Sequence, residues 1–165
     1  MDGNLSDDNI IKIRKTGISK DEFLKSLIRL EKRVTPPLSE NGIDIKSYAE
    51  KLLKFSEIIA IENSEGICGI ISIYVNNTDN GFAYITFIAV DENIAGKGYG
   101  CILLEEAEKK AVSAGLSQIR LEVNNINTPA RRFYQKMGYV ESGTASEHSV
   151  YMTKRKRKLH KNTKG

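Results

Sequence analysis

The segment from residue 82 to residue 123 constrains the fold more than any other part of the chain. It opens with Phe82–Val90, a run rich in β-branched and aromatic residues that predicts a strand. The glycine-rich stretch 95–100 follows, and residues 99–114 then carry apolar side chains on one helical face. Gln118–Val123 has the pattern of a second strand. Two strands joined through a helix run parallel by a right-handed crossover, so this segment predicts a β-loop-α-β unit.

The chain before this unit predicts two helices and an antiparallel meander. A helix is expected over residues 20–33, because Ser19 and Glu22 have the spacing of a capping box, and a second helix begins after Asp44. The apolar period then changes to that of strands, and a short edge strand is expected near the N-terminus. The strands expected here are Ile10–Ile13, Glu57–Ile61, Ile67–Val75 and Phe82–Val90.

The chain after the unit predicts one more helix and two closing strands. Thr128 is the expected N-cap of this helix, Pro129 its first residue and Gly138 its end. The closing strands are Tyr139–Glu141 and His148–Thr153. The whole pattern predicts an α/β (α+β) fold, a mixed and mostly antiparallel sheet of six to seven strands flanked by about four helices.

The glycine-rich stretch Ala95-Gly96-Lys97-Gly98-Tyr99-Gly100 predicts a phosphate site. Glycines let backbone N–H groups crowd together, and the start of a helix adds partial positive charge. Two common phosphate motifs fail here. Gly98 is not followed by Lys and Ser/Thr as in a P-loop, and Cys101 stands where a dinucleotide-binding fold needs glycine. The stretch therefore gives no support to a P-loop NTPase or a Rossmann enzyme.

Three consecutive regions together resemble a known superfamily. They are Tyr84–Val90 with the glycine-rich turn, Arg120–Asn127, and Ala130–Tyr139. In this order they resemble the GCN5-related N-acetyltransferase superfamily, called GNAT. The resemblance implies a GNAT-like fold and acetyl-CoA as the acyl donor.

The resemblance also implies which residues bind the donor. The loop 95–100 would wrap the pyrophosphate with its main-chain N–H groups, and Lys97 would add charge. The first position of this loop is Gln or Arg in the superfamily but Ala95 here, so one side-chain donor is missing. The other implied donor-binding residues are Ile88, Ala89 and Val90, whose strand would pair with the pantetheine arm, and Asn127, Ala130 and Tyr134 of the last helix.

The resemblance gives two candidate catalytic residues. Tyr134 matches the tyrosine that protonates the leaving thiolate, although a tyrosine on this apolar helical face can also simply pack. The glutamate base of histone-acetylating members falls on Tyr84 and cannot be carried over. Glu122 instead has the spacing of the glutamate used by members that acetylate protein N-termini. The base is therefore Glu122 or an ordered water, and the alternative reading of Glu122 is a solvent-facing strand residue.

These residues predict direct transfer of an acetyl group from acetyl-CoA to a primary amine of a small molecule or peptide. The alternative is a non-catalytic module that binds acyl-CoA as a sensor or partner subunit, which the loss of the usual loop donor would fit. In the superfamily the acceptor is set by the loop between the first two helices, here Arg33 to Ile43, and by the last strands. A homodimer is compatible with such a domain.

The charge of the chain is divided unevenly. Seven of its 25 Lys and Arg residues lie in 154–164, which leaves 18 basic against 21 acidic residues in 1–153, a net charge of −3. We expect a single acetyltransferase domain over 1–153 and a basic, disordered tail over 154–165. The tail has no aromatic residues to stack on bases, which argues against nucleic acid as a partner.

The cysteines and histidines predict no metal site. Cys68 and Cys101 lack a metal-ligand spacing and form no disulfide framework, which favours a reducing, cytoplasmic compartment. His148 and His160 have no partner at ligand spacing and are expected to be structural or surface residues; the alternative for His148 is that it lines the acceptor pocket. No stretch approaches the roughly 18 apolar residues of a membrane span, so no membrane contact is expected.

Overall fold

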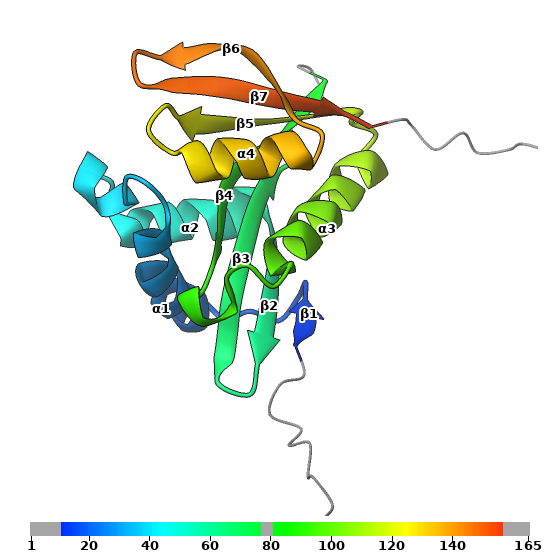
Figure 1. Ribbon diagram of the computed structural model, residues 1–165. Helices are drawn as coiled ribbons and strands as arrows, with labels where there is room; N and C mark the ends of the chain where they lie inside the picture. Colours follow the sequence, from blue (N-terminus) through cyan, green and yellow to red (C-terminus); the bar gives the residue numbers. More distant parts are fainter. Residues whose placement is uncertain (1–10, 77–80, 157–165) are drawn as a thin grey trace, which may run out of the picture.

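The computed structural model describes residues 11–76 and 81–156, and these form one seven-stranded sheet with helices on both faces (Figure 1). The strand order is β1-β2-β3-β4-β5-β7-β6, with β4 and β5 parallel and all other neighbours antiparallel. This confirms the predicted fold class and the crossover. The strands are β1 (Lys12–Arg14), β2 (Glu57–Asn63), β3 (Gly66–Tyr74), β4 (Phe82–Val90), β5 (Gln118–Asn124), β6 (Val140–Ser146) and β7 (Ser149–Arg155). The helices are α1 (Lys20–Leu30), α2 (Ile45–Phe55), α3 (Tyr99–Ser113) and α4 (Thr128–Lys136), with 3-10 turns η2 (Glu31–Arg33), η3 (Leu38–Asn41) and η4 (Glu92–Ile94).

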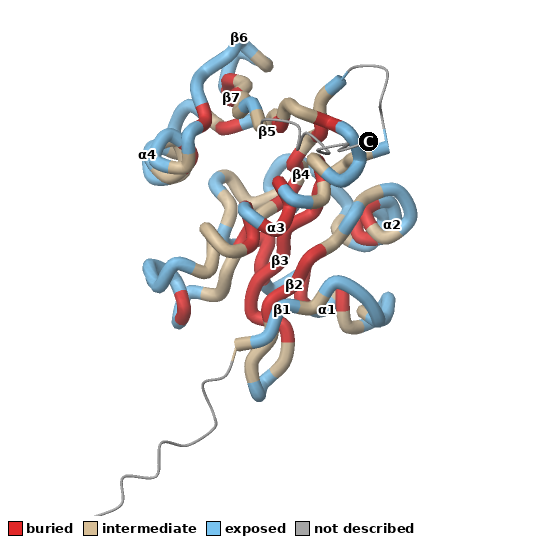
Figure 2. The backbone as a smooth tube through the Cα atoms, turned by 90° about the vertical axis from the view of Figure 1, so that its right-hand side faces the viewer, coloured by how far each residue is buried: buried red, intermediate tan, exposed pale blue. Residues whose placement is uncertain are grey.

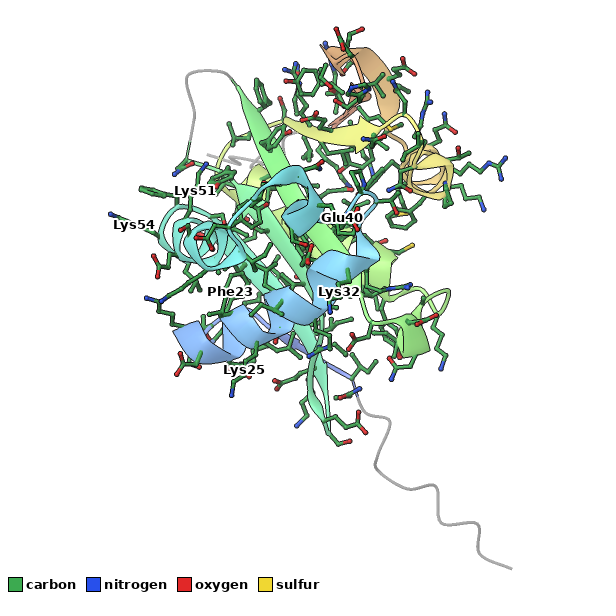
Figure 3. The ribbon with its side chains drawn as sticks, turned by 90° about the vertical axis from the view of Figure 1, so that its left-hand side faces the viewer. Phe23, Lys25, Lys32, Glu40, Lys51 and Lys54 are labelled. Carbon is green, nitrogen blue, oxygen red and sulfur yellow. The ribbon has the colours of Figure 1, made fainter. Side chains whose placement is uncertain are left out.

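The sheet separates two apolar cores. On one face, β2 to β5 pack against Leu103, Leu104, Ala107 and Ala111 of α3. On the other face, β2, β3 and β4 pack against α1 and α2. Phe23 of α1 is fully buried there, while the labelled lysines of these helices lie on the outside (Figure 3). Figure 2 shows the buried residues concentrated in β2, β3 and β4. These strands form the rigid centre of the molecule.

A β-bulge in β4 reverses which face its side chains point to. Ile85 is opposite Ile73 of β3 and Phe87 is opposite Ser72, which leaves Thr86 as the extra residue. Ala83 and Ile85 therefore lie in the core with α3, whereas Phe87 and Ala89 lie in the core with α1 and α2. The Tyr48 hydroxyl of α2 lies 3.0 Å from Thr86 Oγ1, and this contact fixes the bulge against α2.

The parallel strands β4 and β5 are paired only at their beginnings. Phe82 pairs with Gln118 at the first position of their register, and Ile85 pairs with Leu121 at the last. β5 continues alongside β7 as far as Asn124, so β5, β7 and β6 fan away from β2, β3 and β4 (Figure 1). The divergence opens a gap in the sheet at the carboxyl end of β4.

Several element ends differ from the sequence prediction, and two of the differences have a clear side-chain cause. The N-cap of α4 is Asn127 and not Thr128, since the Asn127 side chain accepts a hydrogen bond from the N–H of Ala130. The basic tail does not begin at Lys154, because β7 continues to Arg155. Lys154 Nζ donates to the buried carboxylate Glu108 Oε1 of α3 at 2.9 Å, which ties this strand end to the domain. Residues 157–165 and the N-terminal residues 1–10, including Ile10, lie outside the described part.

None of the helices within the described residues is long and apolar enough to cross a membrane.

Candidate active site

A cavity of about 1090 Å³ occupies the gap between β4 and β5. Its walls come from the second half of β4, the glycine-rich loop, the end of β5, the start of α4 and the segment between α1 and α2. The residues expected to bind the donor that line it are Ile88, Ala89, Val90, Ala95, Gly96, Gly98, Gly100, Asn127, Ala130 and Tyr134. Lys97 and Tyr99, which were also expected to bind, are not among the lining residues.

Ile88 and Val90 turn backbone groups that are not paired with β3 toward this cavity. The N–H of Asp91 donates to Cys68 O, which makes Val90 and Gly69 a non-hydrogen-bonded pair of the β3–β4 ladder. Such pairs alternate in an antiparallel ladder, so the N–H and C=O groups of Ile88 also point away from β3. Because β5 has already diverged, these groups face the cavity. The backbone N–H and C=O groups of Ala89 point to β3 instead. Ala89 can therefore offer a ligand van der Waals contact but no backbone hydrogen bond.

The glycine-rich loop needs glycine at two positions for its backbone conformation. Gly96 and Gly98 have φ angles of 76° and 90°, in the left-handed region, and an added Cβ would meet no atom within 4 Å at either one. Conformation, and not crowding, therefore selects glycine. Gly98 is the N-cap of α3, so the first N–H groups of that helix lie at the cavity wall. Lys97 is exposed, and the partly buried Tyr99 packs against the core beside α3.

Tyr134 reaches the cavity from the inner face of α4. It is only 8% exposed and packs edge-on against Tyr139, with ring centroids 5.8 Å apart. Burial raises the pKa of Tyr134 above its ordinary value, because the phenolate would lose its hydration. The Tyr134 side chain therefore packs in the core, which was one of the two interpretations from the sequence. Its hydroxyl also stays protonated at the edge of the cavity.

Glu122 lies on β5 between the buried residues Leu121 and Val123, and it is both exposed and part of the cavity wall. The Ser149 hydroxyl donates to Glu122 Oε1, and the Tyr84 hydroxyl donates to Oε2 at 3.5 Å. Within residues 11–76 and 81–156, no Lys, Arg or His forms an ion pair with it. Burial, together with the Glu122 charge, raises the pKa of Tyr84. Glu122 is therefore an oriented carboxylate that can accept a proton.

A line of hydroxyl groups leads away from Glu122. A carboxylate only accepts hydrogen bonds, so the Ser149 proton points to Glu122. The oxygen of Ser149 then accepts from Ser146 Oγ, 2.7 Å away. His148 lies between these serines. It is exposed, as expected, and it also lines the cavity, which was the alternative for this residue. His160 lies outside the described residues.

Several lining residues carried no local signal in the sequence. Ser146, Ser149 and His148 come from the end of the chain, and Arg33, Thr35, Leu38 and Ile43 come from the segment between α1 and α2. Only the family resemblance pointed to that segment, because the acceptor loop of the family lies between the first two helices. The structure confirms that the loop borders the same cavity as the glycine-rich stretch.

Asn127 caps α4 with its side-chain oxygen and lines the cavity as well. Its Oδ1 accepts from the N–H of Ala130 at 3.3 Å, which leaves the side-chain amide nitrogen free to contact a ligand.

Replacing Asn127 by alanine should lower the free energy of unfolding by about 1 kcal/mol, as expected for a lost N-cap, measured by urea denaturation of the protein without ligand. Thr128→Ala is the matched control and should change it by less than about 0.5 kcal/mol. Equal losses in both variants would contradict the cap at Asn127.

Comparisons with known proteins agree with this geometry. The profile of the Acetyltransferase (GNAT) family matches residues 24–139. Streptothricin acetyltransferase of Escherichia coli is 41% identical over 71 residues, which cover 43% of this chain and 41% of that protein. IAA acetyltransferase of Azospirillum brasilense is 26% identical over 123 residues, 74% of this chain and 77% of that protein.

The fold comparison extends over most of the chain. The crystal structure of PH1933 from Pyrococcus horikoshii superposes with a TM-score of 0.75 at 25% identity, covering 90% of this chain and 99% of that one. By contrast, this chain spans about half or less of the length of the streptothricin acetyltransferases it matches, 41% and 50%. The match of the family profile across the central sheet, the glycine-rich loop and α4 shows that the chain belongs to the acetyltransferase (GNAT) family.

Proposed function

We propose that this protein transfers an acetyl group from acetyl-CoA to a primary amine of a small molecule or peptide. The observation that carries the proposal is the divergence of β4 and β5 after Ile85 and Leu121. It leaves the backbone of Ile88 and Val90 facing a single cavity that runs from the glycine-rich loop to Glu122. An extended acyl donor and an amine can meet in such a cavity.

The donor side of the cavity fits acetyl-CoA. The N–H groups at the start of α3, behind the left-handed glycines Gly96 and Gly98, suit a diphosphate. The N–H and C=O groups of Ile88 and the N–H of Val90, which point away from β3, suit the amides of a pantetheine arm, as an added strand would. A structure of a similar chain supports this choice. The streptothricin acetyltransferase of Bacillus anthracis described in complex with acetyl coenzyme A is 27% identical and has a TM-score of 0.57.

Two residues would move protons. Acetyl-CoA supplies an activated acyl group as its thioester. Glu122, directly or through an ordered water, accepts the proton that the amine loses when its nitrogen bonds to the acyl carbon. Tyr134 donates its proton to the sulfur as the carbon–sulfur bond breaks. The raised pKa of Tyr134 keeps it protonated near neutral pH, which suits this role.

The acceptor side favours a positively charged amine. Glu122 is the only acidic residue among those lining the cavity, and it has no cationic partner among the described residues. A bound ammonium group would supply that missing charge, and its proton would then lie beside the base. The names of the matched streptothricin acetyltransferases support an amine as the acceptor.

Two measurements test the proposal. Acetyl-CoA at about 100 times its Kd should stabilise the protein by about 2.7 kcal/mol, which raises Tm by about 5 to 10 °C for a domain of this size. Mixing protein, acetyl-CoA and a panel of amines should release free thiol only when both protein and an amine are present. A Tm shift with no thiol release for any amine would favour the non-catalytic acyl-CoA-binding module. No Tm shift would refute both functions.

A further inference from the structure

Arg33 is the only Lys or Arg among the described residues that line the cavity. It lies at the end of η2, directly after α1, and its Nε donates to Val90 O at 3.3 Å. Its neighbour Lys32 is labelled at the same end of α1 in Figure 3 and is not part of the cavity wall. Arg33 is thus attached to the last residue of β4, where the chain leaves the sheet toward the glycine-rich loop.

The charge of Arg33 is not neutralised by the protein within the described residues. Arg29, one helical turn earlier, is paired with Asp91, with its Nε 3.0 Å from Oδ1. Arg131 of α4 is paired with Glu141 at 3.0 Å. Arg33 has no such carboxylate, and only its Nε has a hydrogen-bond partner. The two terminal nitrogens of its guanidinium remain available for a ligand.

The two charged residues of the cavity wall lie at opposite ends of β4. Glu122 contacts Tyr84 near the start of the strand, and Arg33 contacts Val90 at its end. These two β4 residues are about 20 Å apart along an extended strand. An anionic part of a ligand is therefore favoured at the loop end of the cavity, and a cationic part at the Glu122 end.

The glycine-rich loop lacks a charged side chain of its own in the cavity. Ala95 has no donor, and Lys97 is exposed and does not line the wall. We propose that Arg33 contacts the diphosphate of acetyl-CoA and supplies, from the α1–α2 segment, the cation that Ala95 does not provide. This inference rests on the proposed function. A guanidinium forms bidentate, charge-assisted hydrogen bonds with phosphate, and the bond to Val90 O holds Nε while the terminal nitrogens point to the ligand.

The test compares Arg33→Ala with Lys32→Ala, a neighbouring exposed cation that is absent from the cavity wall. Affinities for CoA, dephospho-CoA and pantetheine are measured by titration calorimetry, and Tm serves as the folding control. We expect Arg33→Ala to weaken CoA and dephospho-CoA about tenfold, since a charge-assisted hydrogen bond is lost at a solvent-exposed position. Pantetheine, which has no diphosphate, should bind both proteins within about twofold. Lys32→Ala should bind all three ligands like the wild type.

A rescue variant makes the test specific. Adding Ala95→Arg to Arg33→Ala should restore most of the affinity for CoA, because it returns a guanidinium to the loop itself. Unchanged CoA binding by Arg33→Ala would overturn the inference while leaving the proposed function intact. An equal loss for pantetheine, or a loss for CoA but none for dephospho-CoA, would overturn it as well. Absence of CoA binding by the wild-type protein would instead refute the proposed function, and this inference with it.

Discussion

Replacing Tyr134 by phenylalanine should lower kcat by about 10²- to 10³-fold and leave the KM for acetyl-CoA within about twofold. The change removes one oxygen from a side chain that is 8% exposed and otherwise keeps its packing. No hydrogen bond to this hydroxyl occurs among the described residues, so its loss leaves no protein group unpaired. The effect should therefore fall on the proton given to the leaving thiolate, which steady-state kinetics with an amine identified from the panel would measure.

Tyr139→Phe is the matched control for this variant. Tyr139 packs against Tyr134, is 1% exposed and is not part of the cavity wall. Its hydroxyl is buried without a hydrogen-bond partner, so removing it should leave kcat within about twofold and should not lower Tm. If both variants kept wild-type activity, Tyr134 would be a packing residue and the thiolate would leave without its help.

Replacing Glu122 by glutamine should lower kcat/KM for the amine by about 10²-fold. Glutamine keeps the size of the side chain and can still accept from the Ser149 hydroxyl, but it neither accepts the amine proton nor attracts an ammonium group. Steady-state kinetics of both proteins with an amine identified from the panel would measure the difference.

Glu105→Gln provides the control for a lost negative charge, because Glu105 is exposed on α3 and does not line the cavity. It should change kcat/KM by less than about twofold. A Glu122→Gln variant that kept the wild-type rate would assign the proton transfer to an ordered water. A raised KM for the amine with an unchanged kcat would point to Glu122 as an acceptor-binding residue only.

Local sequence patterns were sufficient for most of the secondary structure. β4 was predicted with its observed ends, and the β4–α3–β5 crossover followed from the change between strand and helix periods. The N-cap of α4 was misplaced by one residue, because Asn127 and Thr128 are both good capping residues. The start of the tail was misplaced as well. A run of basic residues predicts a solvated tail, but the buried carboxylate of Glu108 holds Lys154 in the sheet.

The candidate site was predictable only where its residues are close together in the sequence. The glycine-rich loop and the start of α4 were found in this way, and so were Tyr134 and Glu122 through the family resemblance. Arg33 was expected only as part of the acceptor loop, and its contact with Val90 was not foreseen. Ser149 was not found, because it reaches Glu122 from a distant part of the chain. Lys97 was predicted from its position in the loop, yet its side chain is not in the cavity wall.

The sequence by itself therefore determined the elements, their order and the conformation of the loop, since these depend on side-chain periodicity, capping and the backbone freedom of glycine. Only the tertiary structure decided where β4 and β5 part, which face β4 presents after the bulge at Thr86, and which charges share the cavity. Those features depend on strand pairing and packing between residues far apart in the chain, and no local pattern records them.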